Sequence, residues 1–126
     1  MRCGDCVLMP TGGPQSIPHL WFVITEPQPD EGLCVIVSLT TLRHDRDQTM
    51  LLNVGDHAFI RHASIVLYSD ARIVSAARLD AQIAAGTITK LEACSTRMLK
   101  LIQDGARQSP HTPKKILTFC RKAWGR

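Results

Sequence analysis

The chain has 126 residues, of which 44% are hydrophobic and 21% are charged, and these values are typical of one globular domain. It contains no apolar run of the ~20 residues that a membrane helix needs, and its first residues lack the apolar core of a signal peptide. We therefore expect residues 1–126 to form a single cytoplasmic domain without membrane contact. The odd number of cysteines, five, argues against a disulfide framework.

The first 75 residues predict a set of short β-strands. Apolar and β-branched runs alternate with turn residues, and they occupy positions 6–9, 19–25, 33–39, 50–52, 64–68 and 71–74. A Gly- and Pro-rich loop is expected over residues 11–18. The run over residues 33–39 is apolar on both faces, which is typical of a central strand. Strands at this spacing favour a small β-barrel over residues 1–75.

After residue 75 the hydrophobic period becomes helical. Residues 77–85 predict a short helix, and a Thr-x-x-Glu capping box opens a second pattern over residues 89–105, which a glycine ends. A third amphipathic pattern covers residues 112–124, inside a basic extension over residues 106–126. The predicted fold class is therefore α+β and mainly β, with a barrel followed by C-terminal helices (76–105 and the extension).

The net charge of +4 is unevenly distributed. Residues 97–126 contain eight basic residues and one acidic residue, whereas residues 1–96 contain seven basic and ten acidic residues. Such asymmetry indicates either a surface that binds phosphate groups or a helical face that is simply solvated. Both interpretations stay open at this point.

Histidines are the main candidates for chemistry, because the chain has no P-loop, H-E-x-x-H or G-x-S-x-G motif. His19 begins a predicted strand, and His57 and His62 form an H-x4-H pattern. Cleavage of RNA by its own 2′-OH needs one group that takes a proton and one that gives a proton, and histidine, with an ordinary pKa near 6.5, suits both roles. Residues that can stabilise charge or donate to phosphate are Arg43, Arg46, Arg61, Thr40, Thr41 and Ser64.

Two other interpretations of the histidines remain open. Two or three of them can hold zinc, but a spacing of five within a strand directs His57 and His62 to opposite faces, so no metal site or other cofactor is expected. Each histidine can also have a structural, hydrogen-bonding role. The aromatic residues Trp21, Phe22 and Phe59 are expected in the core, which leaves no exposed platform for stacking of single-stranded nucleic acid.

The order of these features resembles that of PemK/MazF-like toxins. The segments that carry the resemblance are Gly4-Asp5-Cys6-Val7 at the start, the second main strand at residues 19–24, a V-x-V-x-P-x-T/S-like segment at 35–41, the strand pair at 64–74 and the closing helices at 79–105. The resemblance covers residues 4–105.

The resemblance implies an SH3-like barrel that forms a homodimer, cuts single-stranded RNA without metal and is silenced by an antitoxin protein. In that family an Arg before the second main strand acts as acid or base, and a Thr or Ser at the end of the next strand stabilises the phosphate. The matching residues here are His19 and Thr41, and Leu39 stands where the family has Pro. Because His19 replaces the family Arg, we expect it to work with a second imidazole, that of His57.

The sequence thus predicts a metal-independent endoribonuclease of toxin–antitoxin type with His19, His57 and Thr41 as catalytic residues. The residues expected to bind the RNA and its phosphates are Arg43, Arg61, His62 and Ser64. The alternative is a non-catalytic barrel of the same family that binds nucleic acid or a partner protein.

Overall fold

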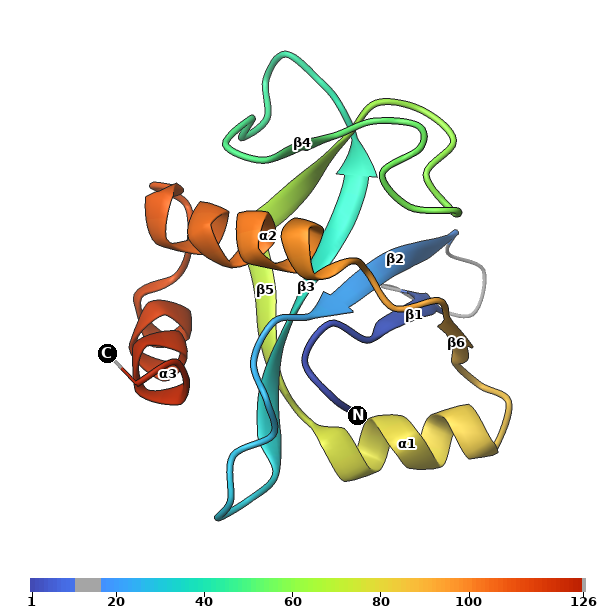
Figure 1. Cartoon of the computed structure of the whole chain (residues 1–126), viewed down its shortest axis with the longest axis vertical. Helices are drawn as coiled ribbons and strands as arrows, with labels where there is room; N and C mark the ends of the chain where they lie inside the picture. Colours follow the sequence, from blue (N-terminus) through green and yellow to red (C-terminus); the bar gives the residue numbers. More distant parts are fainter. Residues whose placement is uncertain (11–16, 126) are drawn as a thin grey trace.

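The computed structural model describes residues 1–10 and 17–125 and has a mixed α+β fold in which strands predominate. Within these residues a curled antiparallel sheet of six strands has the order β4-β5-β3-β2-β1-β6 (Figure 1). The strands are β1 (Cys6–Pro10), β2 (Pro18–Val23), β3 (Leu33–Thr41), β4 (Leu51–Leu52), β5 (Ser64–Ser75) and β6 (Thr89–Leu91). The helices are α1 (Ala76–Ala84), α2 (Thr96–Gln108) and α3 (Lys114–Ala123).

Strand β3 lies inside the sheet, between β2 and β5, and is antiparallel to both. Its residues Val35, Ile36 and Val37 are fully buried, which agrees with the central strand predicted from two apolar faces. Strands β4 and β6 stand at the two ends of the order and do not pair with each other, so the sheet is open between them in the described part of the chain.

Strand β5 is one strand of 12 residues, where the sequence predicted two shorter ones. Its register with β3 is irregular, since Ile36 pairs with Arg72 whereas Ser38 pairs with Leu67. Residues 68–71 therefore stand opposite a single residue of β3 and form a bulge-like irregularity; a bulge commonly redirects the side chains that it contains. The break that was predicted between two strands falls inside this bulge.

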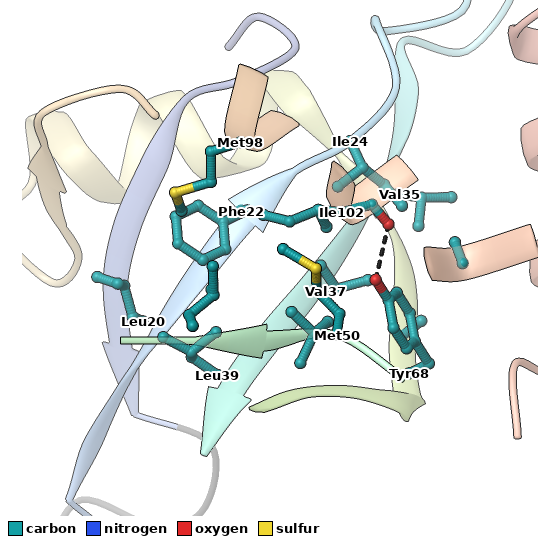
Figure 2. Close-up of a cluster of buried hydrophobic side chains, with 14 of the residues drawn as sticks. Leu20, Phe22, Ile24, Val35, Val37, Leu39, Met50, Tyr68, Met98 and Ile102 are labelled. Carbon is teal, nitrogen blue, oxygen red and sulfur yellow. Dashed lines mark hydrogen bonds between the residues drawn. The ribbon is translucent and has the colours of Figure 1, made fainter. Parts of the chain in front are cut away.

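Hydrophobic side chains are buried on both faces of the sheet. Helices α2 and α3 cover the larger cluster and α1 covers the smaller one. Figure 2 shows the larger cluster, in which the hydroxyl of buried Tyr68 donates a hydrogen bond of 2.7 Å to the carbonyl oxygen of Ile102 on α2. Burial raises the pKa of Tyr68, so the phenol stays protonated and keeps this bond.

The start and end of α2 differ from the prediction. Residues 89–91 of the capping-box pattern form β6 and pair with β1. Helix α2 begins after Ser95, whose hydroxyl accepts a hydrogen bond of 3.1 Å from the amide of Met98. Gly105 does not end the helix but lies inside it. A glycine is needed there because the Tyr68 side chain occupies the space that a Cβ atom would take.

The basic C-terminal residues pack on the core of the domain through the end of α2 and through α3. Helix α3 buries Ile116 and Cys120 in the larger cluster. The indole N–H of Trp124 donates a hydrogen bond of 3.0 Å to the carbonyl oxygen of Ile24, and the guanidinium carbon of Arg107 lies 4.4 Å from the centre of the Trp124 ring.

The loop predicted over residues 11–18 falls largely outside the described residues, and Pro18 already belongs to β2. Among the residues that the structure describes, no helix combines the length and the apolar character needed to cross a bilayer.

Asp47 ties the β3–β4 loop to the turn between α2 and α3. Its carboxylate accepts hydrogen bonds from the amide of Thr49 at 3.0 Å, from the hydroxyl of Thr49 at 2.5 Å and from the hydroxyl of Ser109. Burial raises the pKa of Asp47, but the hydrogen bonds from Ser109 and Thr49 more than offset burial and hold this pKa below its ordinary value of 3.8.

We expect Asp47→Asn to lower the free energy of unfolding by about 1 kcal/mol at neutral pH, because hydrogen bonds to a partly exposed charge are lost. Folding lowers the pKa of this carboxyl, so its contribution is complete above 3.8 and is lost as the pH falls through the folded value. Urea unfolding at several pH values should show that the difference between wild type and variant shrinks in acid. Asp45→Asn in the same loop is the control, and a difference independent of pH would contradict this role of Asp47.

Candidate functional site

A hollow of about 220 Å³ opens where β2 begins, where β3 ends and where the β4–β5 loop returns to the sheet. We call it the His62 hollow. Its polar lining residues are His19, Thr40, Thr41, Arg61, His62 and Ser64. Its apolar lining residues are Leu8, Ile17, Pro18, Leu20, Leu39, Phe59 and Ile60. In Figure 1 these segments meet on the side of the sheet away from α3, so the lysines and arginines of α3 do not surround the hollow.

His19 is half-buried near the start of β2. Its Nδ1 atom lies 3.2 Å from the carbonyl oxygen of Leu39 on β3. Because a carbonyl oxygen only accepts hydrogen bonds, Nδ1 carries the proton in this contact, and Nε2 of the neutral ring is left as an acceptor. The contact with the backbone therefore fixes the tautomer in which His19 can take a proton at Nε2.

Thr41 and His62 are joined at the exposed end of the hollow. The Thr41 hydroxyl lies 2.9 Å from Nε2 of His62. Thr41 pairs with Ser64 across strands β3 and β5, which brings the residues just before β5 next to it. Ser64 itself is buried, and its hydroxyl donates a hydrogen bond of 2.9 Å to the carbonyl oxygen of His62. Ser64 thus holds the backbone of His62 in place, and the phosphate contact that the sequence predicted for it stays a prediction.

His57, the predicted partner of His19, is not in this hollow. It is 6% exposed, and both ring nitrogens have backbone partners. Nε2 lies 2.6 Å from the carbonyl oxygen of Glu92, and Nδ1 accepts a hydrogen bond of 3.1 Å from the amide of Phe59. A ring with both nitrogens occupied cannot exchange protons with a ligand, so we correct its role from catalytic to structural: His57 anchors the loop that carries His62.

The structural role of His57 predicts a loss of stability on substitution. His57→Ala leaves the carbonyl of Glu92 and the amide of Phe59 without their partners, which costs about 1–3 kcal/mol of unfolding free energy. Thermal or urea unfolding measures this loss. His44→Ala, at an exposed position of another loop, is the matched control and should stay within ~0.5 kcal/mol of wild type. Equal stability of the two variants would contradict the anchoring role.

The three candidate arginines are placed differently from one another. Arg61 is exposed and lines the His62 hollow. Arg43 does not line it, because its side chain turns to Asp45 at 3.4 Å. Its expected contact with RNA therefore stays a prediction that this hollow does not support. Arg46 lines a second hollow that shares His19 with the first.

Sequence reasoning missed the aromatic residue of the site. Phe59 was expected in the core, but its side chain is 44% exposed and lines the His62 hollow beside Ile17, which is 79% exposed. Trp21 and Phe22 are fully buried, as expected. An exposed aromatic ring beside polar groups provides a surface on which an unpaired base can stack. The alternation of buried and exposed positions is irregular in the β4–β5 loop, so no sequence pattern marks Phe59 as exposed.

No cluster of three or more His, Cys, Asp or Glu residues suited to a metal ion occurs in the described part of the chain. Burial raises the pKa of Cys3 to about 11 and that of Cys6 further, so the thiols of the N-terminal C-x2-C are held in the protonated form.

Neither any protein-family model nor any curated protein matches this chain. Function is therefore inferred from the geometry of the His62 hollow, and membership of the PemK/MazF-like toxins remains a prediction.

Proposed function

We propose that this protein is a metal-independent endoribonuclease that cuts single-stranded RNA in the His62 hollow. The observation that carries the proposal is the joint lining of one hollow by His19, Thr41, Arg61 and His62. These side chains supply two groups for proton transfer, one neutral hydrogen-bond donor and one permanent cation, which are the groups that phosphodiester cleavage by a 2′-OH requires.

The roles follow from the hydrogen bonds of each ring. Nε2 of His19 takes the proton of the 2′-OH, and the 2′ oxygen forms a bond to phosphorus. The bond between phosphorus and the 5′ oxygen breaks, and protonated His62 gives a proton to that oxygen from Nδ1. Its Nε2–H meanwhile donates to the Thr41 hydroxyl, whose own proton is then directed to the phosphate. The products are a 2′,3′-cyclic phosphate and a free 5′-OH.

The charge and shape of the hollow support an RNA substrate. Arg61 is exposed at its rim and places a fixed positive charge beside the two histidines, where negative charge grows in the transition state. Phe59 offers its ring to a base that is not paired in a duplex. A duplex keeps its bases stacked inside and cannot use this contact, so single-stranded RNA is the favoured substrate.

The resemblance to PemK/MazF-like toxins adds further parts to the proposal. The curled sheet is then a divergent SH3-like barrel, and the protein acts in the cytoplasm as a homodimer. An antitoxin protein that covers the His62 hollow silences it. The nuclease activity proposed for the hollow does not depend on the barrel type, the homodimer, the cytoplasmic location or the antitoxin.

The proposal is tested by incubating the purified protein with single-stranded RNA in the presence of EDTA. We expect fragments whose 3′ ends carry a 2′,3′-cyclic phosphate by mass spectrometry, and we expect none with His19→Ala. Absence of fragments from folded wild-type protein would contradict the proposal. If such protein still binds RNA in a salt-sensitive manner, the result favours the alternative of a non-catalytic binding module.

A further inference from the structure

We propose that a second hollow beside the first binds the base next to the cleaved phosphate, and that it selects a base with an amino group beside a ring acceptor (adenine, guanine or cytosine) over uracil. We call it the Asp70 hollow. Its volume is about 180 Å³, and its lining residues are His19, Ser38, Thr40, Arg46, Leu67 and Asp70. This inference rests on the proposed nuclease function, because it names the part of the RNA that the same site recognises.

The position of His19 connects the two hollows. His19 lines both of them, as does Thr40. On β3, Ser38 lines only the Asp70 hollow and Leu39 and Thr41 line only the His62 hollow, in keeping with the alternation of side chains along a strand, while Thr40 lines both. A nucleotide chain whose phosphate lies between His19 and Thr41 therefore passes over the rim of β3 and places its next base in the Asp70 hollow.

The size and walls of the Asp70 hollow suit one base. Its volume of about 180 Å³ is below that of pockets for drug-sized ligands. Leu67 provides an apolar wall against which a flat ring can pack, and Ser38 offers a hydroxyl although the residue is only 3% exposed. A buried polar side chain that faces a hollow is typical of a site for a polar ligand.

Asp70 is presented to the hollow by the bulge of β5. It lies among residues 68–71, which face a single residue of β3, and bulges commonly redirect side chains beside functional sites. The Asp70 carboxylate meets the guanidinium of Arg72 at 3.4 Å, and the guanidinium carbon of Arg72 lies 4.8 Å from the centre of the Trp21 ring. Arg72 thus holds the carboxylate from one side and leaves acceptor sites for a ligand.

Arg46 faces the same hollow from the β3–β4 loop. Its amide donates a hydrogen bond of 3.2 Å to the carbonyl oxygen of Arg43, and the neighbouring Asp47 fixes the loop through Thr49 and Ser109. In the described part of the chain Arg46 forms no ion pair with Asp70, so the donor and the acceptor are both available to one ligand. Adenine, guanine and cytosine each present an amino donor for the carboxylate and an acceptor for the guanidinium, whereas uracil has no amino group.

The inference is tested with a randomised pool of single-stranded RNA and by sequencing of the cut ends. Wild type should enrich bases with an amino group over uracil beside the cut by at least about fivefold, because one good pair of hydrogen bonds discriminates to this degree. Asp70→Asn should lose the enrichment. Asp45→Asn removes an exposed charge that lines neither hollow, and it should keep the enrichment.

A binding experiment separates this inference from the nuclease proposal. Fluorescence anisotropy of His62→Ala with oligocytidylate and oligouridylate, with and without Asp70→Asn, needs no cleavage. A preference for oligocytidylate that depends on Asp70 supports the hollow even if wild type never cuts RNA. Cutting with the same base preference in wild type and Asp70→Asn overturns the inference and leaves the nuclease in place. Absence of any Asp70-dependent preference in both assays also overturns it.

Discussion

Replacing His62 with alanine should lower the rate of RNA cleavage by about 10²- to 10⁴-fold, the usual contribution of one general acid or base. His62 is exposed and is not part of the core, so the variant should unfold within about 0.5 kcal/mol of wild type. Single-turnover cleavage of a labelled RNA measures the rate, and urea unfolding measures the stability. His44→Ala, also exposed but outside the hollow, should cut RNA at the wild-type rate.

The same experiment separates a catalytic pair from two independent histidines. If His19 and His62 transfer protons in one step, the variant without both should lose about as much activity as the worse single variant. Effects of the single variants that multiply would instead indicate that the two histidines act independently of each other. Full cleavage by His62→Ala would contradict its role as the acid.

Replacing Gly105 with alanine should destabilise the protein by about 3 kcal/mol, although alanine ordinarily favours a helix by ~1 kcal/mol over glycine. A Cβ atom at Gly105 would collide with the hydroxyl oxygen of Tyr68 and stand 3.0 Å from its Cζ atom and 3.3 Å from the Cβ atom of Met50. Relief of the collision requires Tyr68 to move, which breaks its hydrogen bond to Ile102. Overpacking and the lost bond together outweigh the gain in helix propensity.

A double-mutant cycle tests whether the collision with Tyr68 is the cause. Tyr68→Phe alone should cost about 1 kcal/mol, because the carbonyl of Ile102 loses its partner. In the Gly105→Ala background the same change should stabilise the protein, because it removes the atom that collides. Urea unfolding of wild type, the two single variants and the double variant gives the coupling free energy. A Tyr68→Phe effect of the same sign in both backgrounds would contradict the proposed packing.

The sequence predicted the strands and the short helix well, because their signals are local. The apolar run of β3 and the change to a helical period after residue 75 are present in a few neighbouring residues. The capping-box pattern at residues 89–91 failed because β1, more than 80 residues earlier in the chain, pairs with it. The sequence predicts a helix end at Gly105, whereas the packing of Tyr68 against this glycine is a tertiary contact that no local pattern contains.

The candidate site was predicted only in part, because some of its contacts join residues that are far apart in the chain. His19 and Thr41 were identified, and they line one hollow. The H-x4-H spacing indicated that His57 and His62 differ in direction, yet it does not say which of the two is buried. That choice depends on the carbonyl of Glu92, a contact across 35 positions of the chain. The exposure of Phe59 follows from the same anchoring and was equally hidden from local patterns.

The proposed mechanism requires a 2′-OH of the RNA to attack its own phosphate, with His19 taking the proton. The most direct test is an RNA oligonucleotide in which the nucleotide on the 5′ side of the cut bond lacks only its 2′-OH. We expect the folded protein, in EDTA, to bind this oligonucleotide like the unmodified RNA and to leave that bond intact while other bonds are cut. Cleavage of the modified bond at the unmodified rate would contradict the account.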